Sequence, residues 1–256
     1  MIKTVAPALK ALLADLIDYA GLYPPAKLPL DDAIENYKQY KSSEKAWMLR
    51  WFVVGNAELE RVPDSLTGAL SVLSENDQSR AAALETTSIV SSAKPVYCEV
   101  AFTNLDQLDK IKEAGCFAKM RTGGVKPEAI PSPETVASFI LGCAERKLAF
   151  KATAGLHHPI RKEYALTYEP DAPRSTMHGF LNVLMASAFA WHGEKRIEEI
   201  IAEQDPHAFS FNDSVHWRHK SLTAEQVRDA RINFMHAIGS CSFEEPVHDL
   251  ELLGLL

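Results

Sequence analysis

Two lysines lie inside short apolar runs, and they are the residues best suited to carry chemistry. Lys119 stands in Phe-Ala-Lys-Met-Arg and Lys151 in Ala-Phe-Lys-Ala-Thr, and a glycine follows each lysine within five residues. A buried ammonium group costs much more free energy than an apolar side chain, so a lysine at such a position needs a partner or a function. The interval from 119 to 151 is typical of one β-α-β unit, which predicts neighbouring parallel strands for the two lysines.

The expected chemistry of this pair is attack on a carbonyl group. Two ammonium groups held close together repel, so the pKa of one of them falls. A neutral lysine forms a Schiff base, which draws electrons from an adjacent carbon–carbon bond. We expect Lys119 to be the nucleophile and Lys151 its electrostatic partner, with Glu99 or a histidine moving protons. Strand alternation puts Lys119 and Arg121 on one face, where Arg121 would hold a substrate anion.

Other interpretations of these residues stay open. The lysines would also be explained by pairing with acidic residues, of which Glu99 is the obvious candidate, or by binding an anion without turnover. His157 and His158 are adjacent, so they diverge on any regular element, and His157 is the candidate general acid or base. A metal-dependent lyase or hydrolase would use His157 or His158 with His178 and Glu99. Otherwise we expect no metal and no cofactor.

The apolar runs that must position these residues alternate with helical patterns. This alternation predicts an α/β fold, a single TIM-like (β/α)₈ barrel over residues 1–256, with the active site at the carboxyl ends of the strands. An open, doubly wound sheet is the alternative. Two intervals are irregular, because residues 91–95 are too few for a helix and more than fifty residues separate 154 from 209. The expected strands are 16–19, 49–54, 69–73, 86–90, 96–101, 117–121, 149–154 and 209–211, and the expected helices are 31–40, 105–114, 133–147, 177–191 and 223–238.

Several segments, taken in order, resemble one enzyme family. They are Leu16-Ile-Asp-Tyr-Ala-Gly-Leu-Tyr-Pro near the start, Val96-Tyr-Cys-Glu-Val-Ala, Glu113-Ala-Gly-Cys-Phe-Ala-Lys and Phe150-Lys-Ala-Thr-Ala-Gly. Over about half of its length the chain resembles the class I deoxyribose-phosphate aldolases, which are Schiff-base enzymes with a (β/α)₈ barrel. The resemblance implies that Lys119 is the Schiff-base lysine and Lys151 the second lysine, which lowers its pKa. Thr122 and Gly123 match the Thr-Gly of the family's motif.

The chain also departs from the family's pattern. The aspartate of the fourth strand has no clear match, since Glu85 lies one residue ahead of the expected strand. The segment 209–213 lacks the Gly-Ser phosphate cradle of the eighth strand, and Arg121 replaces a small polar residue. We therefore expect a different carbonyl compound, with a carboxylate held by Arg121. The expected substrate-binding residues are Tyr23, Arg121, Thr122, Gly123, Gly124, Thr153, Gly155 and His158.

The composition excludes several other classes of function. With 27 Lys and Arg against 34 Asp and Glu, and no basic run, the chain offers no nucleic-acid surface. Its apolar stretches are too short to span a bilayer. The four cysteines lack C-x-x-C spacing, which favours buried thiols in the cytoplasm. The N-terminal segment is interrupted by charges, which indicates a folded start rather than a signal peptide. We expect a small-molecule substrate, and the leucine-rich end packs on the barrel or between subunits of a homo-oligomer.

Overall fold

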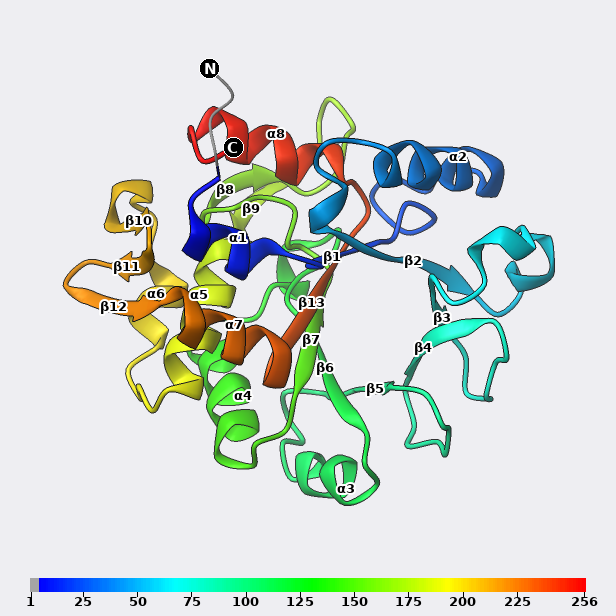
Figure 1. Ribbon diagram of the computed structural model, residues 1–256, viewed down its shortest axis with the longest axis horizontal. Helices are drawn as coiled ribbons and strands as arrows, with labels where there is room; N and C mark the ends of the chain where they lie inside the picture. The colour runs from blue at the N-terminus through cyan, green and yellow to red at the C-terminus, as the bar shows by residue number, and fades with distance from the viewer. Residues whose placement is uncertain (1–4) are drawn as a thin grey trace.

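The backbone closes into a barrel of eight parallel strands (Figure 1). The computed structural model describes residues 5–256, and the predicted α/β barrel is confirmed while the open sheet is excluded. The strands follow one another around the barrel in the order β1, β13, β7, β6, β5, β4, β3 and β2. Their bounds are β1 (Ile17–Tyr19), β2 (Leu49–Gly55), β3 (Leu70–Leu73), β4 (Ala81–Thr86), β5 (Val96–Glu99), β6 (Phe117–Arg121), β7 (Phe150–Thr153) and β13 (Met235–Ser240).

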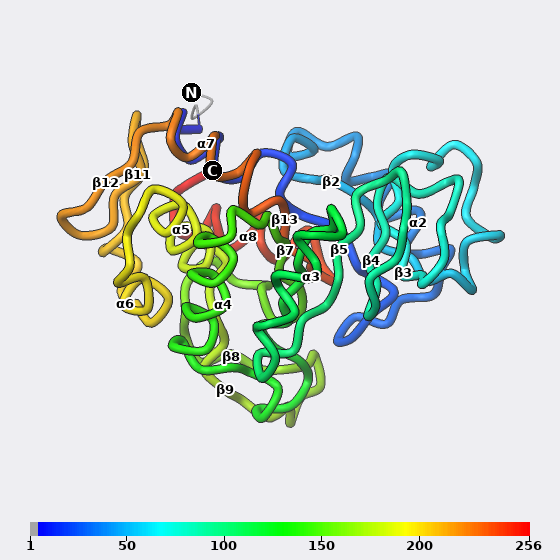
Figure 2. Tube along the Cα trace, turned by 90° about the horizontal axis from the view of Figure 1, so that it is seen from below, coloured from blue at the N-terminus to red at the C-terminus, as the bar shows by residue number. Residues whose placement is uncertain are grey.

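The helices are unevenly distributed around this barrel. Helices α4 to α7 gather on one side of the molecule, and α2 lies beside β2 on the other (Figures 1 and 2). In the described chain, no α-helix lies between β2 and β5: two 3₁₀ helices, Leu59–Arg61 and Asp64–Leu66, connect β2 to β3, and loops connect β3 to β4 and β4 to β5. The α-helices are α1 (Pro7–Leu13), α2 (Leu30–Lys41), α3 (Gln107–Glu113), α4 (Pro133–Glu145), α5 (Phe180–Trp191), α6 (Glu198–Ala202), α7 (Ala224–Asn233) and α8 (Glu244–Leu252).

Two of the eight predicted strands do not match the barrel strands of the structure. The fourth strand is β4, which ends at Thr86 instead of beginning there, because Ala81–Thr86 pairs with β3 and β5. The segment Phe209–Phe211 is a strand, β10, but it pairs with β11 (Ser214–Trp217) in a small sheet that β12 (Lys220–Thr223) completes. The eighth barrel strand is β13, in a segment whose first part the prediction assigned to a helix.

The helix that precedes β13 begins as its sequence predicts and ends early. Thr223 and Gln226 form a capping box at the start of α7. The helix stops at Asn233 because the next residues pair with β1 and β7, which closes the barrel. Sheet closure therefore overrides the helical pattern. The long interval between β7 and β13 also holds the hairpin of β8 (Lys162–Ala165) and β9 (Arg174–Met177).

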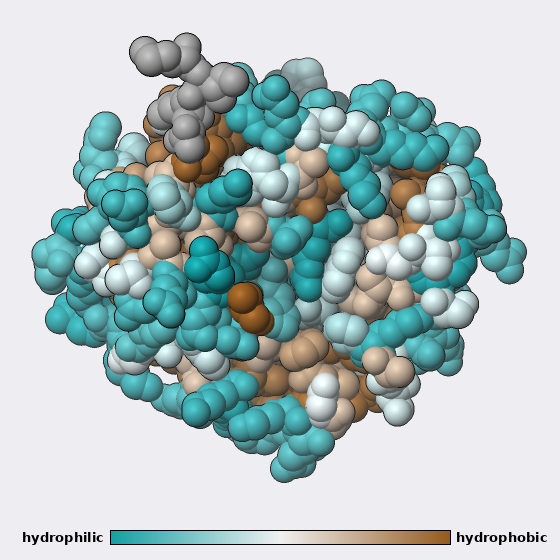
Figure 3. All heavy atoms as spheres, in the orientation of Figure 1, coloured by the Kyte–Doolittle hydropathy of each residue, from teal (hydrophilic) through white to brown (hydrophobic). Residues whose placement is uncertain are grey.

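The core lies between the outer face of the strands and the helices. Helix α5 is buried from Phe180 to Ala190, as its nearly continuous apolar sequence predicts. The face in Figure 3 is mostly hydrophilic, with hydrophobic atoms between the polar side chains. At the carboxyl end, Leu250 is buried against the core while Leu252 is exposed. No described helix, from residue 5 onward, is long and apolar enough to cross a membrane.

Two loops at the carboxyl ends of β6 and β7 touch through glycines. A Cβ atom on Gly155 would lie 2.9 Å from the Cα atom of Gly123, and the φ angle of Gly155 is +76°. The hydroxyl of Thr122 donates a hydrogen bond to the carbonyl of Ala154 at 2.6 Å. The two loops follow β6 and β7, the strands that carry Lys119 and Lys151. Their contact therefore fixes the backbone at the carboxyl ends of these two strands.

We expect Gly155→Ala to destabilise the protein by about 2–4 kcal/mol, because a left-handed residue costs ~1–2 kcal/mol and overpacking adds a similar amount. Gly115→Ala is the matched control, since Gly115 has a φ angle of +69° but no atom within 4 Å of the added Cβ. Urea unfolding measures both variants. Equal destabilisation of the two variants would show that the contact between the loops contributes nothing.

Candidate active site

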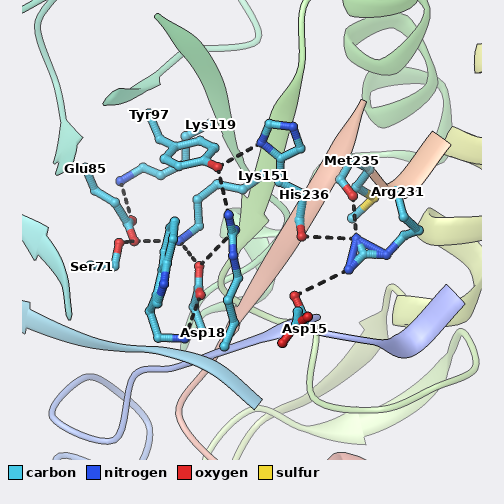
Figure 4. Close-up of polar contacts among 12 residues, drawn as sticks. Asp15, Asp18, Ser71, Glu85, Tyr97, Lys119, Lys151, Arg231, Met235 and His236 are labelled. Atoms are coloured by element: carbon cyan, nitrogen blue, oxygen red, sulfur yellow. Dashed lines mark hydrogen bonds and ion pairs between the residues drawn. The ribbon is translucent and has the colours of Figure 1, made fainter. Parts of the chain in front are cut away.

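Lys119 and Lys151 are direct neighbours across β6 and β7. The register pairs Lys119 with Lys151 on one side and with Glu99 of β5 on the other. Both lysines extend into the barrel (Figure 4), where Lys151 is fully buried and Lys119 is 5% exposed. The predicted placement of the two lysines on adjacent strands is confirmed.

A single carboxylate, that of Glu85, joins the two lysines. The Nζ atom of Lys119 lies 3.2 Å from its Oε2, and the Nζ atom of Lys151 lies 2.6 Å from its Oε1. The carboxylate accepts a third hydrogen bond from the hydroxyl of Ser71, which donates to Oε1 at 2.8 Å. Burial acts to raise the pKa of Glu85, but the two ammonium groups outweigh it and lower that pKa to about 2. Glu85 is therefore ionised throughout the physiological range.

Lys151 has a second carboxylate partner deep in the barrel. Its ammonium binds Asp18 of β1, whose other oxygen accepts a hydrogen bond from the backbone N–H of Trp51 at 3.2 Å. Burial acts to lower the pKa of Lys151, but the charges of Asp18 and Glu85 outweigh it and hold the pKa above its ordinary value. Lys151 therefore stays a cation at neutral pH.

Lys119 borders an open cavity of about 220 Å³ at the carboxyl ends of the strands. Besides Glu85, its Nζ atom lies 3.0 Å from Oε2 of Glu99. The same oxygen is 3.8 Å from the guanidinium of Arg121, whose side chain is half exposed at the cavity. A small molecule in this cavity would meet the Lys119 amine, whereas Lys151 lies behind Glu85.

The cavity gathers most of the predicted substrate-binding residues. Of the predicted residues, Tyr23, Lys119, Arg121, Gly124, Thr153, Gly155 and His157 line it. Thr122 and Gly123 instead hold the two rim loops together. His158 does not line the cavity. Its ring contacts Asp249 at 2.6 Å and stacks on Tyr164. Apolar side chains complete the walls, among them Val53, Leu73, Leu166 and Met177.

His157 reaches the cavity as a neutral imidazole. Its Nδ1 atom lies 3.3 Å from the hydroxyl of Ser240 and 3.6 Å from a carboxylate oxygen of Glu245. Burial and the neighbouring His158 lower the pKa of His157 to about 4. An unprotonated imidazole at neutral pH accepts a proton at one nitrogen and donates one from the other.

The histidines expected for a metal centre are not gathered. The Nε2 atom of His178 lies 2.8 Å from the carbonyl of Pro131, and its Nδ1 faces Arg161 at 3.3 Å. Among residues 5–256 the structure brings together no set of three or more His, Cys, Asp or Glu residues suited to a metal ion.

Sequence reasoning missed three parts of this site. Asp18 and Ser71 had no predicted role, although a lone carboxylate in Leu-Ile-Asp-Tyr is a detectable signal. Glu85 was set aside as a poor match for the family's fourth-strand aspartate because the strand was placed five residues late. The eighth strand ends in Gly239-Ser240, so the conclusion that this strand lacks a Gly-Ser pair was also wrong.

No family model matches this chain, and neither a curated protein nor a solved structure is similar enough to it to count as a match. The fold class therefore rests on the barrel topology, and the candidate site rests on its own geometry.

The low pKa of Glu85 predicts a specific loss of stability in acid. A carboxyl group whose pKa falls on folding stabilises the folded state above its unfolded pKa, and this contribution disappears as the pH drops through the folded pKa. For Glu85 the window runs from about pH 4.5 to about pH 2, and the contribution is on the order of 3 kcal/mol.

Unfolding free energies across this window should fall less steeply for Glu85→Gln than for the wild type. The matched control is Glu163→Gln, which removes an exposed carboxylate that pairs with Arg174. Carboxyl NMR of the wild type provides a second measurement, and an ordinary midpoint for Glu85 would contradict the shared ion pair.

Proposed function

We propose that this protein is a Schiff-base lyase of the aldolase type, acting on a small carbonyl compound that bears an anionic group. The observation that carries the proposal is the position of the Lys119 amine, at the wall of a cavity and between two carboxylates. The resemblance to class I deoxyribose-phosphate aldolases supports the same assignment of Lys119 and Lys151.

The reaction begins with transfer of a proton from the Lys119 ammonium to Glu99, the more exposed of its two carboxylate partners. The free amine then attacks the carbonyl carbon, and the resulting carbinolamine loses its hydroxyl group as water. The iminium accepts the electron pair of the bond between the α and β carbons of the substrate. As this bond breaks, the β-hydroxyl group gives its proton to a base and the β carbon leaves as the carbonyl carbon of the first product, while an enamine remains on Lys119. Protonation of the α carbon of the enamine and addition of water then release the second product and restore the amine.

Glu85 and Lys151 stabilise the charges that arise during these reaction steps. The positive charge of Lys151 partly neutralises Glu85, which leaves Glu99 as the basic partner of Lys119. When Lys119 becomes an iminium, Glu85 still lies beside the positive nitrogen. His157 lines the same cavity and is the candidate for proton transfer at the substrate's oxygen or carbon.

The net charge of the cluster supports an anionic substrate. The linked groups comprise four cations (Arg50, Lys119, Arg121 and Lys151) and three anions (Asp18, Glu85 and Glu99), which leaves one positive charge. Of these groups, two cations (Lys119 and Arg121) and one anion (Glu85) line the cavity itself, so a substrate with one negative charge would neutralise the lining. Arg121 at the cavity rim is the expected contact, and a guanidinium binds either a carboxylate or a phosphate.

A barrel that binds an anion without turnover is the second candidate. It is favoured by the pairing of both lysines with carboxylates, which satisfies their charges without a substrate. The two candidates differ in whether an amine adduct forms, so a trapping experiment separates them.

Borohydride reduction in the presence of a small aldehyde or 2-oxo acid should trap an adduct on Lys119, located by peptide mass mapping. Lys119→Ala should abolish the adduct, because the nucleophile is gone. Lys195→Ala is the control, since Lys195 is an exposed lysine paired with Glu145. Glu99→Gln should slow trapping about a hundredfold through loss of the base. Undiminished trapping by Lys119→Ala would refute the assignment.

Arg121→Gln should separate anionic from neutral substrates. The apparent affinity for a 2-oxo acid or a phosphorylated aldehyde should fall about tenfold, because a charge-assisted hydrogen bond is lost. Trapping of a neutral aldehyde of similar size should be unchanged. Equal losses for both kinds of substrate would mean that Arg121 does not recognise the anion.

A further inference from the structure

A second cavity lies at the opposite end of the barrel. Its volume is about 470 Å³, and its strand residues stand at the beginnings of β2, β5, β6 and β13. Helices α1 and α7 and the loop residues Ala14, Asp15 and Pro95 contribute the remaining wall. The lining residues are Ala11, Ala14, Asp15, Arg50, Pro95, Tyr97, Phe117, Arg228, Arg231, Ile232 and His236. We call this the amino-end cavity.

Positive charge in the amino-end cavity exceeds negative charge. Three arginines line it, and Asp15 is the acidic residue of the lining. Arg231 is 8% exposed, yet no carboxylate of residues 5–256 lies within 4.0 Å of its guanidinium, which donates to backbone carbonyls instead. Arg228 is exposed and forms no ion pair in the described part of the chain.

Arg50 is also incompletely paired. Its Nη2 atom donates to the hydroxyl of Tyr97 at 3.3 Å, and its guanidinium stacks on the ring of Trp51 at 3.7 Å. Its Nη1 atom is buried and, within the described structure, has no hydrogen-bond acceptor. The nearest carboxylate oxygen is on Asp18 at 4.0 Å, and Lys151 already binds that oxygen. A buried guanidinium without a full partner is costly, and an anion would reduce that cost.

Two neighbouring groups respond to this excess of positive charge. Burial, together with repulsion from Arg50, lowers the pKa of Arg231 to about 10. Burial and the repulsion of Arg50 and Arg231 lower the pKa of His236 to about 4. The neutral imidazole lies 2.8 Å from the hydroxyl of Tyr97. Burial is the larger cause of both shifts, and repulsion among the buried cations acts in the same direction.

We propose that the amino-end cavity is a binding site for a small oxyanion, held by Arg50 and Arg228. A phosphate or a carboxylate satisfies the chemistry, because both accept parallel hydrogen bonds from a guanidinium. The aromatic wall of Tyr97 and Phe117 accommodates an apolar group attached to the anion. The site is separate from the candidate active site, since the ring of Tyr97 lies 5.5 Å from the Lys151 ammonium and stands between the two ends of the barrel.

The test is titration of the full chain with inorganic phosphate at constant ionic strength, followed by calorimetry and by NMR of the histidine rings. Saturable binding that shifts the His236 signals is expected, while His157, in the other cavity, reports any binding to the candidate active site. Phenyl phosphate and benzoate form the second arm, and they distinguish phosphate from carboxylate recognition.

Arg228→Gln should weaken phosphate binding at least about fivefold, because a charged donor is lost. Since Arg228 is exposed, this variant should fold, and Arg61→Gln is the matched control at an exposed arginine outside the cavity. Arg50→Gln should weaken binding further. The proposal is overturned if no saturable binding occurs, if His157 shifts and His236 does not, or if the two exposed variants lose equal affinity.

Discussion

The structure of the site depends on the carboxylate of Glu85, which two buried ammonium groups share. Each lysine alone would carry a large desolvation cost inside the barrel. One glutamate accepts from both lysines and also from Ser71, so its two oxygens are satisfied and both positive charges have a partner. The parallel register fixes this geometry, because Lys119 and Lys151 stand at one level on adjacent strands. Strand pairing and ion pairing are therefore mutually dependent.

The shared carboxylate belongs to a longer chain of alternating charges. From the rim inward, the chain runs Arg121, Glu99, Lys119, Glu85, Lys151, Asp18 and Arg50. Its groups pass from half exposed at Arg121 to fully buried at Asp18. Lys119 occupies the point where the buried network meets the cavity. Its ammonium lies between the carboxylates of Glu85 and Glu99, so both carboxylates face the charge on Lys119.

Local sequence patterns predicted the lysine pair but only part of the carboxylate set. An ammonium between apolar residues is a strong signal, and the spacing of Lys119 and Lys151 identified adjacent strands. Glu85 was missed because an alanine-rich run, Ala81–Ala83, carries little strand propensity, and a strand placed five residues late leaves Glu85 outside it. The last strand, β13, was missed because the capped start of α7 favours a longer helix. That helix ends where the following segment pairs with β1 and β7, which lie more than eighty residues away in sequence. The local periodicity of a sequence does not indicate which distant strands will pair.

The two cavities are connected electrostatically through Arg50. This arginine faces Asp18 on one side and lines the amino-end cavity on the other. Its positive charge opposes the ammonium of Lys151, since both compete for the same oxygen of Asp18. An anion beside Arg50 would offset that repulsion and strengthen the hold of Asp18 on Lys151. By thermodynamic linkage, any effect of the anion on substrate affinity would be matched by an equal effect of substrate on the anion. Positive charge therefore borders a cavity at each end of the barrel. An anion bound in one cavity would change the electrostatic potential in the other.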